Sequence, residues 1–170
     1  MKRSDLAGYA GYGYCVSHFH SFLGFHLYLI CAPDGMPIVW ALANPKIAEQ
    51  EAAETTLRHD KHLIRLGQVI VGDKGFDGKE FEMFITRELN AELIRPDRKV
   101  EKPKFGKLGG IPPWVETVCD TIKGQLTLED HGGRTIPGVY SCVVGRLTAF
   151  AAGIWHNWLI GEPNKRSLIA

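Results

Sequence analysis

A strand, a helix and a second strand are predicted in succession between residues 68 and 95, and no other feature of the chain constrains its fold as much. The short apolar run Val69-Ile70-Val71 indicates a buried strand. Apolar residues then repeat at helical spacing, at Phe81, Phe84, Ile85 and Leu89. Residues 91–95 predict another short strand, which Pro96 ends. A helix that joins two strands in this way is typical of a parallel pair, so the pattern predicts an α/β fold.

The segments on either side predict further parts of one mixed sheet with flanking helices. Residues 24–31 and 37–43 are rich in β-forming residues and flank a Pro-Asp-Gly turn at Asp34, which predicts an antiparallel hairpin. Residues 48–57 favour a helix that crosses over the sheet. Asp77 and Glu80 have the spacing of a capping box for the helix that follows.

Two more helices are predicted in the last third of the chain. The first has an apolar stripe at Val115, Cys119, Ile122 and Leu126. The second, over residues 139–158, repeats apolar side chains along a largely buried face. The members of that face are Val139, Cys142, Val143, Leu147, Phe150, Ile154 and Trp158.

Composition predicts one domain over residues 1–170, because a chain of this length with 45% hydrophobic residues can bury one sizeable core. The net charge of +1 is too small to indicate a nucleic-acid partner by itself. The four cysteines have no Cys-x-x-Cys spacing, and we expect buried, reduced thiols in a cytoplasmic protein. The longest apolar run, Leu147 to Trp155, is too short to span a bilayer, so no membrane partner is expected.

Acidic residues stand at two places that suit chemistry on phosphate. Asp73 follows the strand Val69-Ile70-Val71 at the edge where open α/β sheets build their sites. Glu116 lies seven residues before Lys123, two helical turns away on the same face. Taken alone, Asp73 is equally explained as a turn or cap residue, and Glu116 as a first-turn acid. The combination favours carboxylates that converge on a divalent metal.

These motifs resemble those of the DDE transposases of bacterial insertion sequences. In that family the second Asp lies in a strand-end motif like Asp73-Lys74-Gly75-Phe76-Asp77, and the Glu lies on a helix seven residues before a Lys, as Glu116 does before Lys123. Residues 123–126, 131–135 and 152–157 are similar to the family's tail. The resemblance implies a ribonuclease H-like fold and metal-dependent cleavage and strand transfer at transposon ends in double-stranded DNA, with a homo-oligomer on that DNA.

The resemblance also implies the roles of the site residues. Asp73 and Glu116 would be metal ligands for two Mg²⁺ ions, which polarise the scissile phosphate, and Lys123 would contact phosphate. Their carboxylates are then expected within roughly 4–8 Å of each other, the reach of one or two bridging ions.

A basic segment lies between the second parallel strand and the helix that carries Glu116. It is broken by Pro and Gly, and we expect it to contact DNA phosphates. Its basic residues are Arg95, Arg98, Lys99, Lys102, Lys104 and Lys107. A solvated surface is the plainer interpretation of such a run.

The chain departs from the family pattern in two ways. No Asp fits the family's first catalytic position, which predicts that the first strand is missing and the chain is truncated at its N-terminus. Pro112 stands where many relatives carry an Arg. Three functions therefore stay open, which are an active transposase domain, a catalytically inactive remnant that only binds DNA, and a metal-dependent nuclease. The cluster of Cys15, His18, His20 and His26 fits no closed zinc module, and strand positions explain His20 and His26 better.

Overall fold

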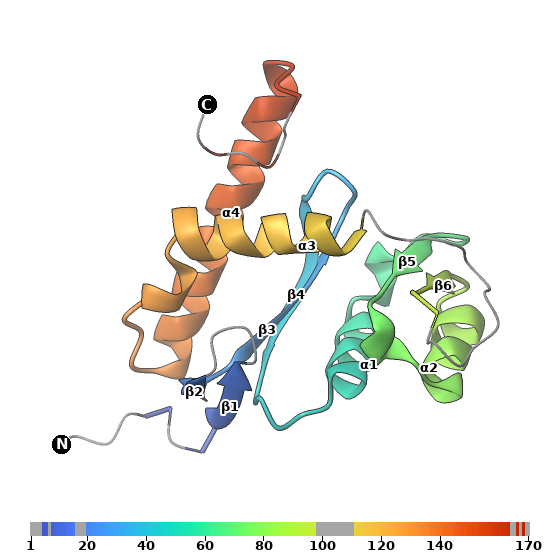
Figure 1. The fold of residues 1–170 in the computed structure, drawn as a ribbon, viewed down its shortest axis with the longest axis horizontal. Coiled ribbons are helices and arrows are strands. Elements are labelled where there is room, and N and C mark those ends of the chain that lie inside the picture. Colours follow the sequence, from blue (N-terminus) through green and yellow to red (C-terminus); the bar gives the residue numbers. More distant parts are fainter. Residues whose placement is uncertain are drawn as a thin grey trace.

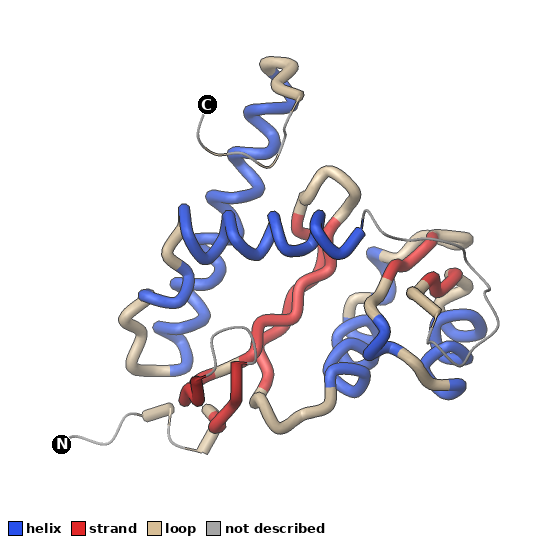
Figure 2. Tube along the Cα trace, in the orientation of Figure 1, coloured by secondary structure: helices blue, strands red, loops and turns tan. Residues whose placement is uncertain are grey.

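The computed structural model describes residues 5–6, 8–15, 20–97, 111–163, 166 and 168, with only the backbone at 15, 20 and 111–113. It is a mixed α/β protein (Figures 1 and 2). Within the described ranges the strands form three separate two-stranded sheets.

Two antiparallel hairpins open the chain. The first pairs β1 (Gly11–Cys15) with β2 (His20–Gly24). The second pairs β3 (His26–Cys31) with β4 (Pro37–Ala43), as the sequence predicts. Gly35 makes the turn between them at a φ of +95°, a conformation in which glycine is not strained. The Asp34 carboxylate accepts a hydrogen bond from the Met36 amide across this turn. His20 and His26 begin strands, as expected.

The predicted strand–helix–strand unit is present. β5 (Val69–Val71) pairs in parallel with β6 (Glu92–Ile94). Between them α2 (Lys79–Met83) continues as a π-helical turn over Phe84–Glu88. α1 (Glu49–His59) precedes this unit and packs its Leu57 against it. The first hydrophobic cluster gathers here, and its buried members are Leu57, Phe81, Phe84, Ile85, Leu89, Ala91 and Leu93.

A second cluster lies between the β3–β4 hairpin and two helices, α3 (Ile111–Asp120) and α4 (Ile136–Leu159). Its buried members are Val118, Ile122, Val139, Val143, Leu147, Phe150 and Ile154. Leu27 and Leu29 of β3 face this cluster, while Ile30 faces the first. Since side chains alternate along a strand, the hairpin separates the two clusters and contributes to both.

The buried face of α3 differs from the predicted stripe. Val118, Thr121 and Ile122 are buried, whereas Val115 and Cys119 are exposed. The helix widens into a π-helical turn over Thr121–Gln125, where the Leu126 amide donates to the Thr121 carbonyl five residues back. Val115 and Cys119 precede this turn, so it does not explain their exposure. Cys119 and Val118 lie three and four residues before the buried Ile122, and spacing alone does not show which of the two is buried.

The single mixed sheet that the sequence predicts is not formed within the described residues. The β3–β4 hairpin and the β5–β6 pair are separate, and each strand pairs on one side only. The predicted hairpin and the predicted parallel pair are both present, but no strand hydrogen bonds join them within the described residues.

α4 is the longest element, and its C-terminal end projects from the body (Figure 1). By length and composition it is the one described helix that could cross a membrane. The predicted core positions Val139, Val143, Leu147, Phe150 and Ile154 are buried. Trp158 is 58% exposed, which corrects its assignment to the core. A core on one side of a helix takes one stripe only, and Trp158 lies on the neighbouring stripe.

Candidate acidic site at the end of strand β5

Asp73 follows β5 and begins a short 3₁₀ turn over Lys74–Phe76. Its Oδ1 accepts a hydrogen bond from the Gly75 amide at 2.6 Å. Asp73 therefore caps a turn, which is the role that its position next to a glycine predicts without any catalytic function. Oδ2 has no hydrogen-bond partner among the described residues.

A second carboxylate, from Glu49 in the first turn of α1, converges on the same place. A Cβ added to Gly75 would lie 2.9 Å from Oδ1 of Asp73 and 3.2 Å from Oε2 of Glu49. Neither carboxylate forms an ion pair with a basic side chain in the described part of the chain. Two negative groups so close repel each other, and a bound cation would relieve that repulsion.

Gln50 fixes the loop against α1. Its side-chain amide donates hydrogen bonds to the carbonyl of Gly75 at 2.7 Å and to that of Asp77 at 2.9 Å. Because Gln50 follows Glu49 directly, the same helical turn that presents one carboxylate also holds the loop that presents the other. The Gln50 side chain thus holds the loop that carries Asp73 against the helical turn that carries Glu49.

The expected capping box of α2 is not formed. Gly78, not Asp77, precedes the helix, and no side chain caps it. Asp77 instead pairs with Arg95 at 3.0 Å, in a contact where both side chains are largely buried. The capping-box spacing assigns the Asp77 carboxylate to the start of α2, but this carboxylate instead pairs with Arg95, 18 residues later in the chain.

Glu116 lies on an exposed part of α3. Lys123, in the π-helical turn that follows, places its ammonium group 3.0 Å from a carboxylate oxygen of Glu129. Both side chains of that pair are about half exposed or more, and an exposed ion pair of this kind contributes little to stability. No three His, Cys, Asp or Glu side chains in the described ranges group together as metal ligands, so Glu116 does not complete a three-ligand set with Asp73 and Glu49.

Of the predicted DNA-contacting residues, the structure places only Arg95, which forms the ion pair with Asp77. The other five, Arg98, Lys99, Lys102, Lys104 and Lys107, lie outside the described residues. The same holds for His18 and for the side chains of Cys15 and His20.

The described cysteines are free thiols with different surroundings. Cys31 and Cys142 are half-buried, and Cys119 is exposed, so the expectation of buried thiols holds for part of the set. Burial raises the pKa of the Cys31 thiol to about 12, with smaller contributions from nearby Cys119 and Asp34. This thiol is therefore neutral and unreactive at physiological pH.

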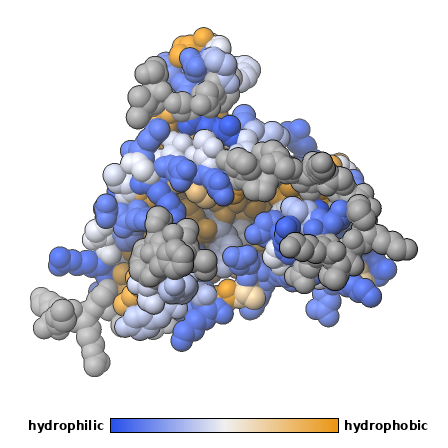
Figure 3. All heavy atoms as spheres, viewed as in Figure 1, coloured by the Kyte–Doolittle hydropathy of each residue, from blue (hydrophilic) through white to orange (hydrophobic). Residues whose placement is uncertain are grey.

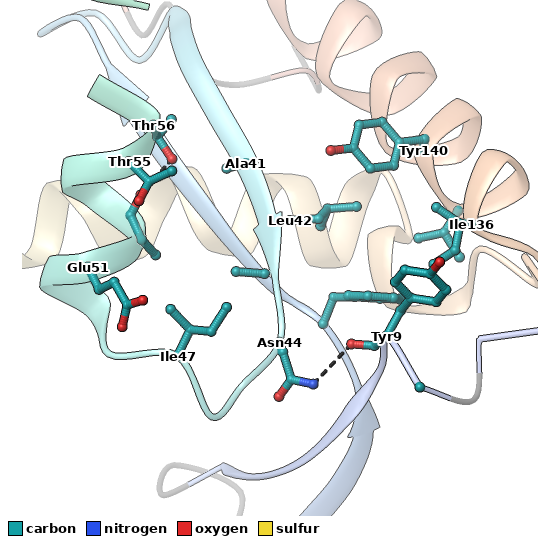
Figure 4. Close-up of a pocket in the computed structure, with 15 residues that line it drawn as sticks. Tyr9, Ala41, Leu42, Asn44, Ile47, Glu51, Thr55, Thr56, Ile136 and Tyr140 are labelled. Atoms are coloured by element: carbon teal, nitrogen blue, oxygen red, sulfur yellow. Dashed lines mark hydrogen bonds between the residues drawn. The ribbon is translucent and has the colours of Figure 1, made fainter. Parts of the chain in front are cut away.

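An open groove of about 610 Å³ lies elsewhere, along β4 (Figure 4). Ile47 of the β4–α1 loop and Glu51 and Thr55 of α1 form one wall, and Ile136 and Tyr140 at the start of α4 form the other. The groove is mostly apolar. It does not include Asp73, Glu116 or Lys123, so it is separate from the acidic site.

Sequence analysis overlooked Glu49. Its position in the first turn of a helix is explained by the helix dipole alone, so the residue carries no signal of its own. No known family model, curated protein or solved structure matches this chain.

Proposed function

We propose that this chain is a ribonuclease H-like domain of a DDE transposase, whose function is metal-dependent cleavage and strand transfer of DNA in the cytoplasm. The observation that carries the proposal is the convergence of Asp73 and Glu49 beside Gly75, directly after a parallel strand. Carboxylates at this edge of an α/β sheet are well placed to hold a divalent metal ion.

The two carboxylates suit one Mg²⁺ ion, because proteins commonly hold this ion through one or two carboxylates and leave the remaining positions to water and substrate phosphate. A bound Mg²⁺ would polarise a phosphate and stabilise negative charge on its oxygens. The set of three carboxylates that two ions require is not present in the described part of the chain. We therefore propose binding of metal and DNA, with cleavage dependent on a further carboxylate.

The arrangement of elements supports the fold assignment. An antiparallel hairpin, a crossover helix, a parallel strand–helix–strand unit and two closing helices follow one another in the order that the resemblance implies. Among the described residues β3 and β5 each pair on one side only, and the family's first strand would pair at their other edges.

DNA contact is proposed for Lys123 and for the basic segment that precedes α3. Lys123 is held by an exposed ion pair with Glu129, and a DNA phosphate can replace that carboxylate at little cost. Lys99, Lys102 and Lys104 remain the predicted phosphate contacts of the basic segment.

The test is a titration of a short fluorescent DNA duplex with the full chain, with and without Mg²⁺. We expect the metal to increase DNA affinity for the wild type, but not for Asp73→Asn, and we expect no cleavage. Replacement of Lys99, Lys102 and Lys104 by Ala should weaken binding and reduce its dependence on salt. DNA affinity that is unchanged both by Mg²⁺ and by Asp73→Asn would favour a catalytically inactive remnant that only binds DNA. Cleavage by the wild type of duplexes of any sequence would favour a metal-dependent nuclease.

A further inference from the structure

α4 carries a second apolar stripe beside the one that faces the core. Tyr140, Val144, Trp155 and Trp158 are each 44–58% exposed. Eighteen residues are five helical turns, so Trp158 stands directly above Tyr140, about 27 Å along the axis. Val144 and Trp155 fall on the same face between them. The exposed stripe therefore runs almost the length of the helix.

The two ends of this stripe differ in form. At the C-terminal end the indoles of Trp155 and Trp158 stack with centroids 5.3 Å apart. Leu159 and Ile160 extend the apolar cluster at the projecting tip (Figure 3). At the N-terminal end, Tyr140 borders the apolar groove along β4 (Figure 4). One end projects and the other is hollow.

The middle of the stripe suits close contact with another helix. Thr148 and Ala151 lie on this face halfway between Tyr140 and Trp158, and their small side chains allow helix axes to approach. Arg146 is the only Lys, Arg, Asp or Glu residue in α4, and its Nε donates to the Leu126 carbonyl at 2.8 Å. No fixed charge on the stripe would oppose an identical stripe.

We propose that α4 is the interface of a symmetric dimer, in which the α4 helices of two chains pack antiparallel. The stacked indoles of each chain then enter the groove beside Tyr140 of the other. Because the two contacts are identical, one two-fold axis near the middle of the stripe satisfies both and closes the assembly. The dimer forms without DNA and without the acidic site, so it is independent of the proposed function.

A membrane surface fits the same stripe less well. Helices that lie on membranes generally carry several Lys or Arg on their polar face, whereas α4 has Arg146 alone. The opposite side of α4 is also occupied, since Val143, Leu147 and Phe150 pack into the second cluster.

Sedimentation velocity of the full chain from about 1 to about 100 µM tests the proposal. We expect a monomer–dimer equilibrium, with the dissociation constant raised at least about 30-fold by Trp158→Ala, as for an aromatic residue that is buried in a groove of its partner. Leu66→Ala is the matched control, because Leu66 is 81% exposed and lies far from α4 in the sequence. It should leave the equilibrium unchanged. Circular dichroism establishes that each variant is folded.

A charge pair tests the antiparallel arrangement. Val144→Glu and Trp155→Lys should each be monomeric alone, because each homodimer would bury an unpaired charge against an apolar side chain of the partner. Their mixture should form a heterodimer, since the antiparallel arrangement places Glu opposite Lys. A monomeric wild type, a dimer insensitive to Trp158→Ala, or a mixture that stays monomeric would overturn the proposal. So would a monomer that co-sediments with phosphatidylcholine vesicles through Trp158.

Discussion

One carboxylate oxygen of Glu49 and one of Asp73 each lie within 3.2 Å of the point where a Cβ on Gly75 would stand. Glu49 belongs to a helix that precedes β5 and Asp73 to the loop that follows it, so the pair forms only when the domain folds. This contact relates the fold to the proposed chemistry.

Metal binding should depend on both carboxylates. We expect Asp73→Asn and Glu49→Gln each to weaken Mn²⁺ binding at least tenfold, because each removes one of two anionic oxygen ligands. Mn²⁺ is the probe because carboxylate sites suited to Mg²⁺ also accept it. Glu51→Gln is the matched control, since Glu51 lies in the same helical turn but borders the groove. Paramagnetic resonance titration measures the concentration of free Mn²⁺. Equal Mn²⁺ affinity of the wild type and the three variants would contradict a metal site at these two carboxylates.

Gly75→Ala should weaken metal binding without removing a ligand. The added methyl group would lie 2.9 Å from Oδ1 of Asp73, closer than unbonded carbon and oxygen atoms normally approach. The carboxylates must then separate, and the methyl group occupies the space between them. The same titration should show lower affinity, with thermal unfolding as the check that the variant folds. Unchanged affinity would place the ion elsewhere.

Lys123→Gln should lower DNA affinity and reduce the slope of log affinity against log salt by about 1, the value for one lost phosphate contact. Stability should change little, because the ion pair with Glu129 is exposed. Lys61→Gln is the control, at another exposed lysine. Anisotropy titrations at several salt concentrations measure the slope. An identical slope in all three proteins would mean that Lys123 makes no contact with DNA phosphate.

Alkaline pH should destabilise the protein through Cys31. Burial raises the pKa of this thiol to about 12, so the folded chain keeps it neutral while the unfolded chain ionises it. The contribution to stability is therefore complete below the pKa of the unfolded thiol, about 8.5, and is lost as pH rises towards 12. The slope is at most about 1.4 kcal/mol per pH unit. Urea unfolding between pH 7 and 10 should show a steeper decline for the wild type than for Cys31→Ala. Parallel curves would contradict this.

Thr127→Gly should stabilise the protein by about 1 kcal/mol, although it removes a side chain. Thr127 adopts a φ of +49°, in the left-handed region that is unfavourable for a β-branched residue. Glycine adopts this conformation without strain. Thr135→Gly is the contrasting variant, because the Thr135 side chain caps α4 by accepting from the Gly138 amide, and its loss should destabilise. Thermal unfolding distinguishes the two signs.

The sequence predicts elements whose signal is local. The β3–β4 hairpin, the β5–α2–β6 unit and the core face of α4 are confirmed because turn residues and apolar periods act over short distances. The prediction that Asp77 caps α2 is wrong because its carboxylate pairs with Arg95, which is distant in sequence. The prediction that Trp158 belongs to the core is wrong because periodicity does not show which of two adjacent apolar stripes is buried.

The candidate site is half predictable for the same reason. Asp73 is recognisable from its place after an apolar strand. Glu49 is not, because it comes close to Asp73 only when α1 packs against the loop after β5. The pairing of Asp73 with Glu116 stays a prediction.

The two hydrogen bonds from Gln50 to the carbonyls of Gly75 and Asp77 have a dynamic consequence. The loop after β5 leaves its position only when these two hydrogen bonds break. We therefore expect backbone amides in the loop and in the first turn of α1 to exchange together, with similar opening free energies. Any backbone motion that separates the helical turn of Glu49 from the loop of Asp73 must break these two hydrogen bonds, whereas a side-chain rotation of Glu49 moves its carboxylate and leaves both backbone segments in place.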